Sequence, residues 1–135
     1  MSWLKELLHS EKDRIHVLAV MPDILDRSAL EGIASRAGWD LRFSPGCDDA
    51  VGSLQRHPAN VIICDRDQRR YDWRDVLRRL AAEGPGIPII VSATETDDLF
   101  WLAVMEHGGY DVVTRPFAEG RLVKTVLHAA NRVMK

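Results

Sequence analysis

Three side chains suited to phosphoryl chemistry follow apolar runs of the chain. Asp65 comes directly after the run Val61–Cys64, and Ser92 and Arg115 follow two later runs. A carboxylate can accept a phosphoryl group covalently, while a hydroxyl and a guanidinium can hold its oxygens. These residue types predict a phosphate-handling site, provided that the fold brings the three together.

Five short apolar runs alternate with five helical patterns. The predicted strands are Ile15–Val20, Trp39–Phe43, Val61–Cys64, Ile87–Val91 and Tyr110–Val113. The predicted helices are Asp23–Arg36, Asp48–His57, Tyr71–Glu83, Thr96–His107 and Phe117–Met134. This alternation with short links predicts an α/β fold, a parallel sheet with helices on both faces. Ligands bind such sheets at the carboxyl ends of the strands, where Asp65, Ser92 and Arg115 should meet.

Capping residues mark several of the expected helix ends. Gly38 is expected to end the first helix, since glycine readily adopts the left-handed conformation found there. Asp48 or Asp49 is expected to cap the second helix, and Thr96 or Asp97 the fourth, through side-chain oxygens that accept backbone hydrogen bonds.

Three motifs, in register with this strand pattern, resemble the receiver domains of two-component response regulators. They are Val61–Asp65, Ile87–Ala93 and Gly108–Phe117, and the resemblance extends over residues 14–134. The resemblance implies a flavodoxin-like fold, a doubly wound (βα)5 domain whose five-stranded parallel sheet has the order 2-1-3-4-5. It also implies phosphorelay signal transduction, with a histidine kinase or a downstream regulator as the protein partner.

The resemblance implies roles for five positions. Asp65 matches the phosphoacceptor aspartate, and Ser92 matches the Ser/Thr that contacts the phosphoryl group. Arg115 stands where the family usually has a lysine, and Val112 where it usually has its aromatic switch residue. Pro116 matches a proline that in receivers often follows a cis peptide bond.

The paired acids that end the family's first strand are absent. Met21 and Pro22 occupy their positions, and Asp23 follows them. In the family this pair and the phosphoacceptor hold Mg²⁺, which requires oxygen ligands. A metal held by Asp23 and Asp65 would require Asp23 to turn inward. We therefore expect a degenerate, or pseudo-, receiver that acts through protein contacts, with Arg115 neutralising Asp65 in an ion pair.

Two alternatives stand beside this interpretation. One is a phosphorylation-competent receiver that accepts a phosphoryl group on Asp65 from a histidine kinase, and Mg²⁺ binding separates it from the degenerate form. The other is a flavin- or nucleotide-binding flavodoxin-like protein, which the lack of a Gly-rich loop after the first strand disfavours. On the degenerate interpretation the chain is not an enzyme.

Composition argues against other classes of function. The formal net charge of −2 provides no general attraction for nucleic acid or an anionic membrane. No apolar run approaches the roughly 20 residues that a membrane span requires. The two cysteines, one of them in a predicted buried strand, favour a reducing cytoplasm over a disulfide framework. Six arginines between residues 66 and 79 alternate with aspartates, which is typical of a solvated helical face.

The chain divides into an N-terminal amphipathic extension, residues 1–13, and a receiver-like domain, residues 14–135. The extension is expected to form an extra helical turn on the domain or a contact with a partner. Phe100 and Trp101 lie side by side on the predicted fourth helix, so they must point in different directions. In receivers the face formed by helix four, strand five and helix five is the usual interaction surface, which allows a homodimer there.

Overall fold

Five parallel strands form the centre of the protein. The computed structural model describes residues 14–134. The strands are β1 (His16–Val20), β2 (Asp40–Ser44), β3 (Val61–Asp65), β4 (Ile89–Ala93) and β5 (Asp111–Thr114). They lie side by side in the order β2-β1-β3-β4-β5, and all four neighbouring pairs are parallel. The expected α/β fold and its strand order are therefore confirmed.

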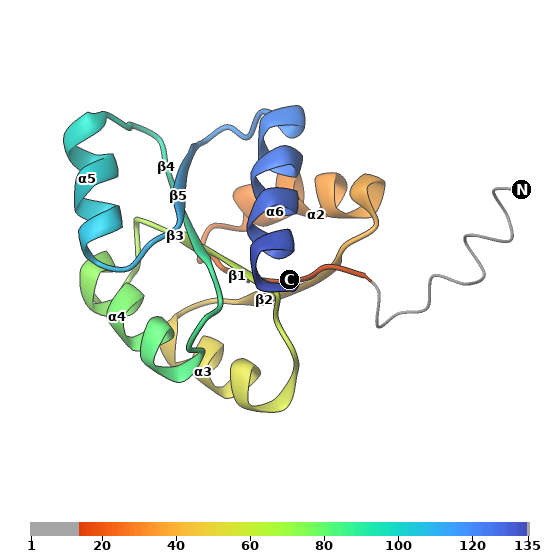
Figure 1. Cartoon of the computed structure of the whole chain (residues 1–135). Coiled ribbons are helices and arrows are strands. Elements are labelled where there is room, and N and C mark those ends of the chain that lie inside the picture. Colours follow the sequence, from red (N-terminus) through yellow and green to blue (C-terminus); the bar gives the residue numbers. More distant parts are fainter. Residues whose placement is uncertain (1–13, 135) are drawn as a thin grey trace, which may run out of the picture.

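Helices cover both faces of this sheet. They are α2 (Ile24–Ala37), α3 (Cys47–Arg56), α4 (Trp73–Glu83), α5 (Asp98–Glu106) and α6 (Glu119–Met134). Figure 1 shows α2 and α6 on one face and α3, α4 and α5 on the other. Each face packs into its own cluster of buried apolar side chains. Burying one such side chain contributes about 1.5–3 kcal/mol, so the two clusters drive the folding of the sheet.

The alternation of side chains along β3 decides which way Asp65 points. Every residue of β3 is buried. Ile62 and Cys64 belong to the cluster under α3, α4 and α5, whereas Ile63 belongs to the cluster under α2 and α6. Because successive side chains of a strand point to opposite faces, Asp65 points to the α2 and α6 face.

The fourth strand begins two residues later than predicted. The apolar run starts at Ile87, but β4 starts at Ile89. Pro88 has no N–H to donate to a neighbouring strand, and only its carbonyl is used, accepting a bond from the Ile62 amide at 3.0 Å. The strand also ends two residues later than predicted, at Ala93, so Ser92 lies inside β4, in register with Asp65.

Most of the expected caps are present. Gly38 ends α2 in the left-handed conformation, with φ of 78°. Asp97 caps α5 by accepting a 2.7 Å bond from the Phe100 amide. The prediction for α3 was wrong, because its N-cap is Gly46, with no side-chain cap, and both Asp48 and Asp49 lie in its first turn.

The expected N-terminal extension, residues 1–13, lies outside the described residues. Among the helices of residues 14–134, none combines the length and the apolar character that crossing a bilayer requires.

Candidate functional site

Asp65 and Ser92 lie next to each other at the carboxyl edge of the sheet. They are register partners in β3 and β4, so their side chains point to the same face. Both are buried, with 1% and 0% of their surface exposed. The Ser92 hydroxyl oxygen has no hydrogen-bond partner among the described residues. A buried hydroxyl without a partner is costly, so Ser92 has an unused donor and acceptor beside the Asp65 carboxylate.

Arg115 brings a cation to the same place from the end of β5. Its backbone N–H donates to the Ala93 carbonyl at 2.8 Å, and a cis peptide bond joins it to Pro116. One guanidinium nitrogen of Arg115 lies 3.0 Å from a carboxylate oxygen of Asp65. The guanidinium is about nine-tenths buried. The sheet edge therefore joins the three expected side chains and forms the expected ion pair.

Two further carboxylates contact the same guanidinium. Asp26, in the first turn of α2, lies 2.9 Å from one terminal nitrogen, and Asp67, in the loop after β3, lies 3.2 Å from the other. The Asp67 amide also donates to an Asp65 carboxylate oxygen at 3.3 Å. We call these four residues, Asp26, Asp65, Asp67 and Arg115, the arginine cluster. In it one cation serves three acidic groups.

Burial dominates the ionisation of Asp65. The low-polarity surroundings raise the pKa of Asp65 from its ordinary 3.8 to about 6, although Arg115 and the Asp67 amide act in the opposite direction. The neighbouring carboxylates of Asp67 and Asp26 add to the rise. At neutral pH the carboxylate is thus charged but held at an energetic cost.

Three members of the site were not expected from the sequence. Neither Asp26 nor Asp67 directly follows an apolar run, so the sequence did not mark them. The only available signal for Asp26 was its place in the first turn of α2, which starts at the carboxyl edge of the sheet. Gln68 donates from its side-chain amide to the Asp65 carbonyl at 2.6 Å and to the Val20 carbonyl at 3.3 Å. It thereby joins the ends of β3 and β1.

The residues at the end of β1 do not fit a Mg²⁺ ion. Met21 is fully buried in the apolar cluster, and Pro22 has no side-chain donor. Asp23 does not turn inward, since its carboxylate caps α2 and accepts a 2.8 Å bond from the Leu25 amide. The Arg115 guanidinium already contacts Asp65 and would repel a second cation. No cluster of three potential metal-ligating acids, histidines or cysteines occurs within residues 14–134.

Val112, at the expected switch position, lies within the core. It is 6% exposed and belongs to the cluster that also contains Phe100 and Val104 of α5. Nearby, the hydroxyls of Thr96 and Thr114 are 3.3 Å apart. A small branched side chain in this place has no ring or hydroxyl to move between a buried and an exposed position.

The arginine-rich segment forms an exposed, ion-paired surface. Arg74, Arg78 and Arg79 pair with aspartates, and all three are exposed. Arg66 lies over the ring of Phe100, with 4.6 Å between its guanidinium carbon and the ring centroid. This agrees with the expected solvated face.

Comparisons with known proteins point to one family. The profile of the family described as "Response regulator receiver domain" matches residues 17–127. The C4-dicarboxylate transport transcriptional regulatory protein of Rhizobium meliloti is 24% identical over 106 residues, which are 78% of this chain and 23% of that protein. The probable transcriptional regulatory protein TcrX of Mycobacterium tuberculosis is 27% identical over 81 residues, 60% of this chain and 35% of that protein. The chain thus spans about a quarter to a third of these relatives.

Solved structures show the same fold. The chemotaxis protein CheY4 of Vibrio cholerae superposes with a TM-score of 0.79 at 21% identity, covering 86% of this chain and 98% of that one. A putative response regulator from Chloroflexus aurantiacus gives 0.81 at 22% identity, covering 88% and 99%.

Proposed function

The chain belongs to the response regulator receiver domain family, and we propose that it signals through contacts with partner proteins. In this proposal the Arg115 guanidinium, paired with Asp65, takes the place of a metal ion in the acidic site. Receiver domains work in two-component signal transduction, where they interact with histidine kinases and output domains. In this proposal Asp65 is a structural carboxylate, and Mg²⁺-dependent phosphorylation is weak or absent. A cytoplasmic location remains a prediction.

The observation that carries the proposal is the arginine cluster. Its guanidinium contacts Asp65, Asp26 and Asp67 at 2.9–3.2 Å, while Met21 and Pro22 stand where metal-binding acids would be needed. Phosphoryl transfer depends on electrostatic stabilisation of the transferring oxygens. Without a metal ion the reaction loses several kcal/mol of such stabilisation. The pairing of Asp65 with Arg115 also makes its carboxylate a weaker nucleophile than a free carboxylate.

The test is a titration with beryllofluoride, a phosphoryl mimic, in the presence of Mg²⁺, followed by tryptophan fluorescence. Trp73 begins α4 soon after Asp65 and contacts the Phe100 ring, so it should report changes in this loop. We expect no saturable change in the wild type, and the same trace from Asp65→Asn. A saturating response that Asp65→Asn abolishes would refute the proposal.

A second candidate is a phosphorylation-competent receiver, and the unpartnered Ser92 hydroxyl favours it. An Asp65 carboxylate oxygen would attack the phosphorus of acetyl phosphate, and the bond from phosphorus to the acetate oxygen would break, with acetate leaving. Ser92 and Arg115 would then hold phosphoryl oxygens. Intact mass spectrometry after incubation with acetyl phosphate decides between the candidates. A phosphoryl adduct in the wild type, absent from Asp65→Asn, would establish this one.

The proposed contact surface lies on α5. Leu99, Trp101 and Leu102 are 77%, 45% and 49% exposed, whereas Phe100 is buried at 9%. Adjacent apolar side chains open to water are typical of protein interfaces. We propose that they form part of the α5, β5 and α6 face through which two copies pair.

Sedimentation velocity over a range of concentrations tests this pairing. Wild type should dimerise more readily than Leu99→Ser, while Leu25→Ser, at an equally exposed apolar position on α2, should behave like wild type. A monomer at every concentration would exclude the homodimer.

A further inference from the structure

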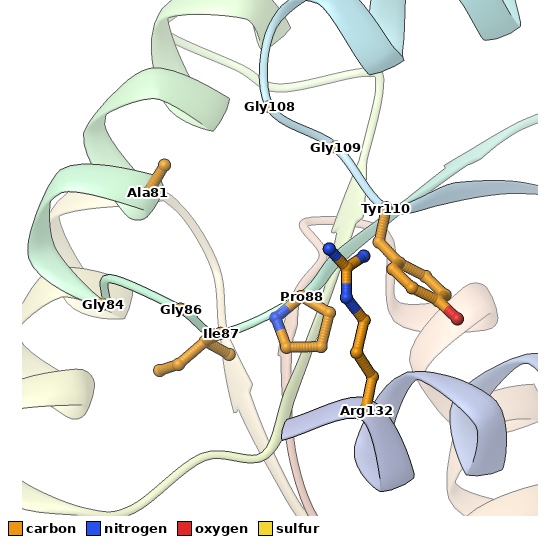
Figure 2. A pocket seen from close by; sticks show the side chains of 9 residues that line it. All are labelled: Ala81, Gly84, Gly86, Ile87, Pro88, Gly108, Gly109, Tyr110 and Arg132. Carbon is orange, nitrogen blue, oxygen red and sulfur yellow. The ribbon is translucent and has the colours of Figure 1, made fainter. Parts of the chain in front are cut away.

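A cavity of about 550 Å³ lies at the amino edge of the sheet, the edge opposite Asp65. Its walls come from the end of α4, the loop before β4, the loop before β5 and the last turn of α6 (Figure 2). The lining residues are Ala81, Gly84, Gly86, Ile87, Pro88, Gly108, Gly109, Tyr110 and Arg132. A volume of this size is in the range of small-molecule sites.

Arg132 gives the cavity one positive charge. Figure 2 shows its side chain rising from α6 beside the Tyr110 ring, with the guanidinium directed toward Pro88 and Gly109. The guanidinium carbon lies 5.5 Å from the Tyr110 ring centroid. No lining residue is acidic, and no ion pair of Arg132 occurs within residues 14–134. The fork of N–H donors is therefore free to bind an oxyanion.

The remaining walls are apolar or bare backbone. Ile87, Pro88 and the Tyr110 ring provide apolar surface beside the guanidinium. Gly86 and Gly108 have φ of 84° and 93°, a conformation that suits glycine, and a Cβ on either would meet no atom within 4 Å. The positive φ, and not a lack of space, is therefore what favours glycine in these two turns, and the cavity wall there is backbone.

We propose that this cavity binds a small organic monocarboxylate with an apolar body the size of one ring. The carboxylate would pair with the Arg132 guanidinium, and the body would lie against Ile87, Pro88 and Tyr110. A dianion suits the site less well, because the lining offers one counter-charge only. The proposal goes beyond the signalling role, since it concerns the opposite edge of the sheet and does not depend on the state of Asp65.

The experiment is an NMR titration of the ¹⁵N-labelled full chain with benzoate, using neutral benzamide as the matched control ligand. The amide signals of the cavity glycines should shift saturably with benzoate, and benzamide should bind at least about ten-fold more weakly because it cannot form the charge-assisted pair. Inorganic phosphate, which lacks the apolar body, should also bind more weakly than benzoate.

Variants of α6 identify the group responsible. Arg132→Gln should remove the preference for benzoate over benzamide, and Arg132→Lys, which keeps the charge but loses the fork, should weaken it. Arg121→Gln, at an exposed cation of the same helix outside this cavity, should leave it unchanged. Equal binding of the two ligands, benzoate shifts that survive Arg132→Gln, or no saturable shift at all would overturn the proposal. Wild-type-like signal dispersion in Arg132→Lys guards against loss of the fold.

Discussion

An arginine lies at each edge of the sheet, Arg115 at the carboxyl ends of the strands and Arg132 at the amino ends, and the two have different surroundings. At the carboxyl edge the Arg115 guanidinium is nine-tenths buried and contacts three carboxylates. At the amino edge Arg132 is exposed, lies beside one aromatic ring and lines a cavity without acidic residues. The protein's own carboxylates pair both terminal nitrogens of Arg115, although the buried Nε has no partner among the described residues, whereas the Arg132 guanidinium is open to a ligand. The same two strands, β4 and β5, begin near one arginine and end near the other.

The comparison indicates that the charge of Arg115 contributes to the stability of the fold, whereas the charge of Arg132 is available to bind a ligand. A buried carboxylate beside a cation depends strongly on that cation, because removing one partner leaves an uncompensated buried charge. An exposed cation is already solvated by water, so its loss changes little in the free protein.

The largest effect should follow from removing the cation of the arginine cluster. Arg115→Ala should lower the free energy of unfolding by about 3–5 kcal/mol at neutral pH, because the buried Asp65 then has to stay charged without a partner or take up a proton. In an Asp65→Asn background the same substitution should cost less, since no buried carboxylate at that position depends on the guanidinium. Urea denaturation of the four proteins measures both values.

The matched control for this double-mutant cycle is Arg132→Ala, which removes the arginine at the amino edge of the sheet. Arg132→Ala should lower the free energy of unfolding by no more than about 1 kcal/mol, the range for a cation in the last turn of a helix. If Arg115→Ala lowers the free energy of unfolding equally in the wild-type and Asp65→Asn backgrounds, the ion pair with Asp65 does not stabilise the fold. A loss from Arg132→Ala as large as that from Arg115→Ala would erase the contrast between the edges.

The next effect concerns pH. Because the pKa of Asp65 is about 6 in the folded state and 3.8 in its ordinary surroundings, the folded protein binds more protons between these values. Its stability should therefore fall by about 2–3 kcal/mol, relative to Asp65→Asn, as pH rises from about 4 to about 7. Thermal or urea unfolding of both proteins across this range measures the difference. A difference that stays constant, or one that grows in favour of the wild type, would contradict the raised pKa.

The smallest effect should come from Ser92. Its hydroxyl is fully buried and has no partner, so Ser92→Ala removes an unsatisfied polar group and should raise the free energy of unfolding by about 1 kcal/mol. Equilibrium urea unfolding is the measurement, with Ser53→Ala on α3 as a control that should change stability little. A clear destabilisation by Ser92→Ala would show that the hydroxyl does have a partner in solution.

The strand ends could be predicted from sequence because apolar runs and their neighbours are local features. Asp65, Ser92 and Arg115 were identified as strand-end groups, and the parallel sheet does bring them to one edge. The start of β4 was misplaced because hydrophobicity does not distinguish Pro88 from a residue that can donate a hydrogen bond. The cap of α3 was misplaced because an aspartate is favourable anywhere in the first turn of a helix as well as at the N-cap, so residue type alone does not tell which position Asp48 or Asp49 occupies.

The partners of Arg115 were only partly predictable. Its pair with Asp65 follows from strand order, but Asp26 lies 89 residues away along the chain and reaches the guanidinium only through the packing of α2 on the sheet. The amino-edge cavity had no signal in the sequence, because it depends on how two glycine turns and the last turn of α6 meet in space.

By itself the sequence determined the α/β architecture, the carboxyl-edge position of Asp65, Ser92 and Arg115, and the loss of the acids at Met21 and Pro22. Those properties depend on residue type and on short-range periodicity. The tertiary structure alone decided that one guanidinium contacts three carboxylates, that burial raises the pKa of Asp65, and that Arg132 faces an open cavity. Electrostatic interactions depend on distance and burial, and neither can be obtained from the order of residues along the chain.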